Sequence, residues 1–248
     1  MALGFVDRLI FCPPEPSYDE AAQRLVRLES ATGDEIVAFH QETPGAALTV
    51  LFAHGNAEDL GDSFGHAEQY AQLGVSVFSS DYPGYGLSSG KPTEGAAYAA
   101  AATAYQYLCE HVGLDTEAIV AHGRSLGGGV MVDLASRVSV GGLIIESSFV
   151  SVYRVVTRVP ILPVDQFTSL AKLAGVTAPV LVIHGQRDEV IAPWHGQRLW
   201  EALPRHRRSS LWVEDAGHND LVEVAGRSYW DALSTFIASV EDALPAGA

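Results

Sequence analysis

The stretch that decides the fold covers residues 118–137 and reads AIVAHGRSLGGGVMVDLASR. It opens with a short apolar run of the kind found in strands that are buried on both faces. Its second half, VMVDLASR, has a helical pattern, and the motif GRSLG at residues 123–127 joins the two. A serine between glycines at a strand-to-helix junction is typical of a nucleophile turn, in which a strained backbone lifts the hydroxyl above the sheet. We therefore predict that Ser125 is a catalytic nucleophile.

The segments around this stretch repeat its alternation of short apolar runs and longer helical patterns. That alternation is typical of a mostly parallel sheet flanked by helices. Buried strands are predicted over Leu48–Ala53, Val75–Ser80, Ala118–His122, Gly142–Ser147 and Pro179–His184, and antiparallel edge strands over Phe5–Phe11 and Ile36–His40. Helices are predicted by apolar stripes from Leu60 to a stop at Gly74, from Ala97 to a stop before Gly113, and from Val222 to Val240.

Composition limits the class of protein. The chain has 248 residues, of which 48% are hydrophobic and 18% charged, and it has no Gly-, Pro- or Ser-rich linker, so we expect one domain over residues 1–248. The net charge of −15 disfavours nucleic acid and anionic lipid surfaces as partners. No apolar run reaches the roughly 18 residues of a membrane helix, and no signal peptide pattern is present, so we expect a cytoplasmic protein.

A serine nucleophile needs a base that is itself oriented by a third group. In hydrolases built on such sheets the chain order is serine, acid, histidine. Asp188 follows the strand PVLVIH in the loop GQRDEVI, and His218 follows the last strand in LWVEDAGHND. We therefore predict a triad of Ser125, Asp188 and His218.

Several other polar residues compete for these roles. Glu146 ends the preceding strand, where some hydrolases carry their acid, and is the main alternative to Asp188. Asp215 is expected to shape the turn before His218, while His54, His122 and His184 are interpreted as structural. The two cysteines, Cys12 and Cys109, form no CxxC motif, and we expect neither a disulfide nor a zinc site.

Acyl transfer also needs hydrogen-bond donors for a developing oxyanion. One is expected from the N–H of Leu126, directly after the nucleophile. The second is expected from the N–H of Asn56 in the loop HGNAEDLG, where Gly55 lets the backbone turn. The acidic residues that follow at 58, 59 and 62 are interpreted as partners of a helix dipole, and no metal-ligand spacing is found, so no metal is expected.

A resemblance to a known family agrees with these assignments. The motifs that carry it are PPEPSY (13–18), HGNAEDLG (54–61), DYPGYGLSSGKPTE (81–94), GRSLG (123–127), VDLASR (132–137), APVLVIHGQRDEVI (178–191) and GHND (217–220). The chain resembles the α/β-hydrolase superfamily, and within it the protein depalmitoylases (palmitoyl-protein thioesterases) and related small serine hydrolases. The resemblance implies a mostly parallel eight-stranded sheet, the same triad and oxyanion donors, and no cofactor.

The chain departs from those depalmitoylases at its start. They carry a cysteine-rich leader that is acylated and tethers them to membranes, whereas this region holds only Cys12. We therefore expect no stable membrane anchor.

The segment from Phe149 to Thr177 lies where α/β hydrolases insert lids. It is short and contains two prolines, so we expect one or two short helices, a minimal cap and an open site. Candidate pocket walls are Val150, Tyr153, Phe167 and Trp194.

The sequence thus predicts a serine hydrolase that cleaves carboxylic esters or thioesters through an acyl-serine. Its expected substrates are a small-molecule ester or thioester, or an acylated protein, with no nucleic acid partner. A serine peptidase or acyltransferase on the same fold, and a non-catalytic member that only binds a ligand, are the alternatives.

Overall fold

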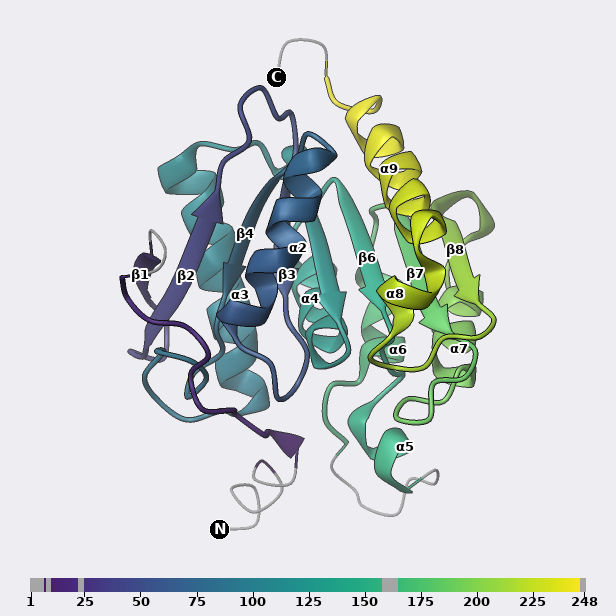
Figure 1. The fold of residues 1–248 in the computed structure, drawn as a ribbon, viewed down its shortest axis with the longest axis horizontal. Coiled ribbons are helices and arrows are strands. Elements are labelled where there is room, and N and C mark those ends of the chain that lie inside the picture. The colour runs from purple at the N-terminus through teal and green to yellow at the C-terminus, as the bar shows by residue number, and fades with distance from the viewer. Residues whose placement is uncertain (1–6, 8–9, 22–24, 158–164, 246–248) are drawn as a thin grey trace. The chain divides into compact units, whose positions relative to one another are not determined.

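Figure 1 shows the computed structural model, which describes the chain except residues 1–6, 8–9, 22–24, 158–164 and 246–248. The chain divides into two compact units, Met1–Asp115 and Thr116–Ala248. The described residues contain eight strands, four in each unit. Within these residues no helix is long and apolar enough to cross a membrane.

The first unit has its strands in the order β1, β2, β4, β3. They are β1 (Leu25–Glu29), β2 (Glu35–Gln41), β3 (Thr49–Ala53) and β4 (Ser76–Ser80). The pairs β1–β2 and β2–β4 are antiparallel, and β3–β4 is parallel. Helices α2 (Leu60–Gln72) and α3 (Glu94–Tyr107) lie on opposite faces of these strands, as Figure 1 shows, and a π-helix (Leu108–Val112) follows α3. Every residue of β3 and β4 is buried, as their apolar runs predicted.

The second unit has four parallel strands in the order β5, β6, β7, β8. They are β5 (Ile119–Arg124), β6 (Gly142–Glu146), β7 (Val180–Gly185) and β8 (Arg208–Val213). The helices are α4 (Leu126–Arg137), α5 (Val152–Thr157), α6 (Ser169–Lys172), α7 (Trp194–Ala202), α8 (Leu221–Ala225) and α9 (Arg227–Glu241). In Figure 1, α8 and α9 lie in front of these strands and α4 and α7 behind them. The loops that follow β5, β7 and β8 carry the residues predicted to do chemistry.

Three details of the predicted elements differ in the structure. The edge strand is β1, because a turn with Gly33 at φ +79° returns the chain onto β2 and forms a hairpin. The expected strand Phe5–Phe11 lies largely outside the described residues, and Phe11 itself is not in a strand. The expected last helix is two helices, since Gly226 at φ +52° separates α8 from α9.

Candidate active site

Ser125 sits in a strained turn between β5 and α4. Its backbone has φ +52° and ψ −113°, a region that residues with a side chain rarely adopt. The strain is held from both sides, because Ser125 N–H donates to the carbonyl of Glu146 at 2.8 Å and Ser148 Oγ donates to the carbonyl of Ser125 at 2.8 Å. The turn is therefore fixed by the neighbouring strand β6 and by the loop that follows it.

Glycine at position 123 is required by how closely α4 approaches β5. A Cβ atom on Gly123 would lie 2.1 Å from the carbonyl oxygen of Gly127. No side chain fits there, so the first glycine of the GRSLG motif has a steric cause in this structure. The motif thereby places the N-terminus of α4, with its partial positive charge, beside the serine hydroxyl.

The structure brings the three predicted triad side chains together. His218 Nε2 lies 3.1 Å from Ser125 Oγ, and His218 Nδ1 lies 2.7 Å from Asp188 Oδ2. Asp188 comes from the loop after β7 and His218 from the loop after β8, so the ends of three strands of one parallel sheet, β5, β7 and β8, supply the triad. Hydroxyl, imidazole and carboxylate form a continuous hydrogen-bonded chain, the arrangement that makes a serine nucleophilic.

The carboxylate of Asp188 is held in its ionised form. Burial by itself raises the pKa of this carboxyl, but hydrogen bonds from His184, His218 and the N–H of Ile191 outweigh burial and lower the pKa below its usual range. Its Oδ1 accepts from Val190 N–H at 2.9 Å and from Ile191 N–H at 2.7 Å. Oδ2 is thereby directed at the imidazole.

Glu146, the alternative acid, is engaged elsewhere. Its Oε2 lies 3.1 Å from His122 Nε2 and accepts a 2.6 Å hydrogen bond from Tyr229 OH. Burial raises the pKa of Glu146, but the hydrogen bond from His122 and the charges of His122 and Arg124 lower it to about 2. The carboxylate that contacts His218 is that of Asp188.

The other competing residues also have structural partners. Asp215 pairs with Arg187 on the surface at 2.6 Å, and His184 Nε2 lies 2.8 Å from the carbonyl of Ile191. His54 Nδ1 lies 2.8 Å from the carbonyl of Gly55. These contacts agree with the structural interpretation of the two histidines.

The two predicted oxyanion donors belong to different units. Leu126 is the first residue of α4, where backbone N–H groups have no acceptor within the helix. Asn56 follows β3 in the first unit, and its side-chain oxygen accepts from Cys12 N–H at 3.0 Å and from Tyr85 OH at 2.6 Å. Both donor roles stay predictions.

The acidic residues after Asn56 cap helix α2. Asp59 is the N-cap, and Asp62 completes a capping box with it, while Glu58 accepts from Gly55 N–H at 2.6 Å. Within the described residues no group of three His, Cys, Asp or Glu side chains could hold a metal ion.

The candidate pocket walls differ in exposure. Val150 is 4% exposed and Phe167 0%, whereas Tyr153 and Trp194 are partly exposed. Phe167 packs against Phe149, so it contributes to the core of the second unit. Their roles toward a substrate stay predictions.

Two polar residues near the triad were not singled out by sequence reasoning. His195 is 1% exposed, and its Nδ1 accepts from Val150 N–H at 3.2 Å. Burial and the charge of His184 lower the pKa of His195 to about 4, so it is neutral at pH 7. The second residue is Arg124, whose guanidinium donates to the carbonyl of His218 at 3.1 Å. Its place directly before the nucleophile is the only hint that the sequence offered.

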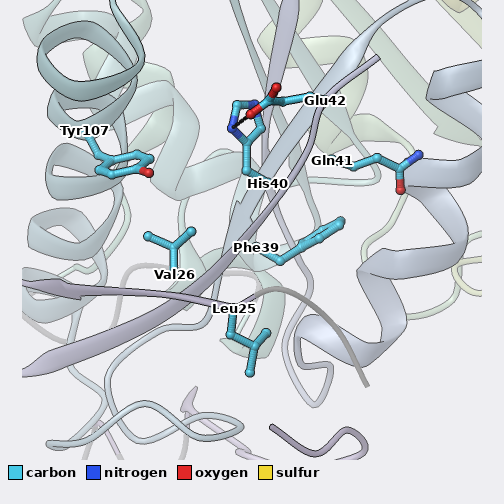
Figure 2. A pocket seen from close by; sticks show the side chains of 7 residues that line it. All are labelled: Leu25, Val26, Phe39, His40, Gln41, Glu42 and Tyr107. Carbon is cyan, nitrogen blue, oxygen red and sulfur yellow. Dashed lines mark ion pairs between the residues drawn. The ribbon is translucent and has the colours of Figure 1, made fainter. Parts of the chain in front are cut away.

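A separate hollow of about 660 Å³ opens in the first unit. Figure 2 shows that it is lined by Leu25, Val26, Phe39, His40, Gln41, Glu42 and Tyr107. Among its polar residues, His40 Nδ1 lies 3.8 Å from Glu42 Oε1, and burial lowers the pKa of His40, which favours the neutral imidazole. The hollow contains none of the predicted catalytic residues.

Comparisons with known proteins place this chain in a family. No protein-family model matches the chain. Over 261 residues it is 36% identical to human alpha/beta hydrolase domain-containing protein 17B, a match that covers 93% of this chain and 90% of that protein. The chain belongs to the alpha/beta hydrolase domain-containing protein 17 family. A second family member, protein 17C from Xenopus tropicalis, is 43% identical over 203 residues, covering 79% of this chain and 63% of that relative. The chain therefore spans less than two thirds of the length of the 17C relatives.

Solved structures confirm the fold of this family member. An esterase from Pyrococcus furiosus matches with a TM-score of 0.76 and 18% identity, covering 92% of this chain and 98% of that one. An alpha-beta hydrolase from Vibrio vulnificus matches with a TM-score of 0.71 and 22% identity, covering 87% and 82%. The predicted α/β-hydrolase fold and superfamily are both confirmed.

Proposed function

We propose that this chain is a serine hydrolase that cleaves carboxylic ester or thioester bonds through a covalent acyl-serine. The observation that carries the proposal is the chain of contacts from Ser125 Oγ to His218 Nε2 at 3.1 Å and from His218 Nδ1 to Asp188 at 2.7 Å. Residue types, order and spacing match what acyl transfer requires of a nucleophile, its base and the group that orients the base.

In the first half-reaction Ser125 Oγ bonds to the substrate carbonyl carbon while its proton passes to His218 Nε2. The oxyanion that forms accepts a hydrogen bond from the N–H of Leu126. The tetrahedral intermediate collapses, the bond to the alcohol or thiol breaks, and His218 gives its proton to that leaving group. Asp188 stays ionised and stabilises the imidazolium.

In the second half-reaction a water molecule takes the place of the alcohol or thiol. His218 accepts a proton from the water, whose oxygen bonds to the acyl carbon. Collapse of this intermediate releases the carboxylic acid and returns the proton to Ser125. Atoms and protons balance over the cycle, and no cofactor takes part.

The proposed substrate class rests on the family resemblance and on the expected minimal cap. The motifs shared with depalmitoylases favour thioesters and acylated proteins. The described part of the insertion after β6 forms the short helices α5 and α6 and a 3-10 helix at Leu173–Gly175, and short elements of this kind favour access by a bulky leaving group. We propose small-molecule esters and thioesters, and acylated proteins, as its substrates.

Kinetics of two variants test the proposal. Ser125→Ala and His218→Ala should each lower kcat by roughly 10⁴–10⁶ while the proteins stay folded. The assay pairs an oxygen ester with a thioester of the same acyl chain, so that one experiment gives both the reaction and the preferred leaving group. A kcat of folded Ser125→Ala within tenfold of the wild-type value would contradict the proposal.

A further inference from the structure

Arg124 connects the nucleophile strand to the loop that carries the catalytic histidine. Its Nη2 donates to the carbonyl oxygen of His218 at 3.1 Å and to Asn219 Oδ1 at 3.1 Å. Its side chain is 11% exposed, and the hydrogen bond to the carbonyl of His218 is partly buried, whereas the one to Asn219 is exposed. The residue directly before Ser125 therefore contacts the backbone of the base that activates Ser125.

Glu146 holds the other side of the same guanidinium. Arg124 and Glu146 are paired neighbours on the parallel strands β5 and β6, and Arg124 Nε lies 3.6 Å from Glu146 Oε1. The carboxylate is 1% exposed and is fixed by His122 Nε2 at 3.1 Å and Tyr229 OH at 2.6 Å. A buried carboxylate with several partners is a rigid anchor, because moving it would break hydrogen bonds that water cannot replace in the interior.

The His218 loop has further contacts that fix its course. Gly217 N–H donates to Asp220 Oδ1 at 2.7 Å, and Arg187 N–H donates to the carbonyl of Ala216 at 2.9 Å. Gly185 lets the loop approach, since a Cβ atom there would lie 2.4 Å from the carbonyl of Ala216. Those contacts hold the residues on either side of His218, whereas Arg124 binds the peptide group of His218 itself.

We propose that Arg124, anchored by Glu146, is a positioning residue that fixes the backbone of His218 so that its imidazole stays in line with Ser125 Oγ. The inference rests on the proposed serine hydrolase function and adds to it a residue that touches neither substrate nor reacting atoms. A guanidinium can hold this position because it has several N–H groups, so that Nε faces Glu146 while Nη2 binds the loop. An ammonium group on a flexible stem offers no such fork.

The exposed Arg187 supplies a matched control. Its side chain pairs with Asp215 of the same loop, with 71% and 64% of the two side chains exposed. Arg187→Ala therefore removes an arginine contact to this loop without touching the peptide group of His218. A general perturbation of the loop would appear in both variants, whereas the loss of His218 positioning would appear only at Arg124.

The experiment compares wild type with Arg124→Ala, Arg124→Lys, Glu146→Gln and Arg187→Ala. For each protein, kcat and KM are measured on a short-chain p-nitrophenyl ester, together with the rate of Ser125 phosphonylation by a fluorophosphonate and the melting temperature. Because a displacement of about 1 Å can lower a rate about 100-fold, Arg124→Ala should lose about 10- to 100-fold in kcat and in phosphonylation rate, with KM within about threefold. Arg124→Lys should recover part of the loss, Glu146→Gln should lose less than about tenfold because its amide oxygen still accepts, and Arg187→Ala should match wild type.

The proposal is overturned if folded Arg124→Ala keeps both rates within threefold of wild type, if its loss is confined to KM, or if Arg187→Ala loses as much. If Arg124→Ala does not fold, Arg124→Lys decides by the same criteria, since it keeps the charge and loses the fork. Failure of the underlying function gives a different result: folded wild type would then neither hydrolyse the ester nor react with the fluorophosphonate.

Discussion

Replacing Asp188 by asparagine should disable the enzyme through the tautomer of His218. In the structure Oδ1 accepts from two backbone N–H groups, of Val190 at 2.9 Å and Ile191 at 2.7 Å, and Oδ2 faces His218 Nδ1 at 2.7 Å. The asparagine oxygen will take the Oδ1 position, because only an acceptor satisfies both N–H groups. The amide NH₂ then donates to Nδ1, and the imidazole proton moves to Nε2. A protonated Nε2 cannot accept the proton of the Ser125 hydroxyl.

The expected loss follows from that exchange. A triad whose histidine is held in the wrong tautomer loses about 10⁴ in kcat, or about 5.5 kcal/mol of transition-state stabilisation. The backbone hydrogen bonds survive, so the melting temperature should change little. Glu146→Gln tests the alternative acid: it makes the same chemical change in a carboxylate that contacts no part of the His218 side chain and reaches His218 only through Arg124, so it should lose less than about tenfold.

The assay is steady-state hydrolysis of a short-chain ester by both variants at neutral pH, with folding checked by circular dichroism. Folded Asp188→Asn within tenfold of wild type would refute the tautomer argument. A larger loss in Glu146→Gln than in Asp188→Asn would move the acid to β6.

Three other predictions concern stability and access. Because the pKa of Glu146 is about 2 in the folded protein and about 4.3 is usual for an unfolded chain, its ionisation stabilises the fold above pH 4.3 and that stabilisation is lost as pH falls toward 2. Denaturant unfolding between pH 4.5 and 2 should thus show a shallower pH dependence in Glu146→Gln, and an unchanged slope would contradict this. Gly123→Ala should abolish activity and lower the melting temperature, since its Cβ would lie 2.1 Å from a carbonyl oxygen. The control is Gly95→Ala, whose Cβ would have no atom within 4 Å and which should stabilise the fold by about 0.4–1 kcal/mol. Comparable melting temperatures of the two variants would refute the steric argument. Initial rates measured across the critical micelle concentration should follow simple saturation, because the described helices within the insertion 149–177 are too short to move as a lid, and a several-fold jump would show the reverse.

The sequence predicted most of the candidate site because its determinants are local. Ser125 lies in a five-residue motif whose first glycine has a steric cause, and Asp188 and His218 each follow a strand in the expected order. Buried parallel strands appear in a sequence as continuous apolar runs, so the ends of such strands could be located without the structure. A loop just past such an end is where catalytic side chains gather in this architecture.

What the sequence missed depends on contacts between distant residues. The guanidinium of Arg124 meets the carbonyl of His218 across 94 positions of the chain, and neither residue type nor local pattern specifies that pairing. The partners of Glu146 likewise come from two other elements, so its terminal position on β6 made it a credible acid until its hydrogen bonds were known. β1 was missed because a short, half-exposed edge strand has too little apolar periodicity to stand out.

The most direct test of the proposed triad is the covalent reactivity of the Ser125 hydroxyl. Wild-type protein is treated with a fluorophosphonate, digested, and the adduct located by mass spectrometry, with Ser125→Ala and His218→Ala in parallel. Wild type should carry one stoichiometric adduct on Ser125, Ser125→Ala should carry none, and His218→Ala should react far more slowly, because only a serine activated by its base attacks phosphorus readily. A folded wild-type protein that stays unlabelled, or that carries the adduct on another serine, would contradict it.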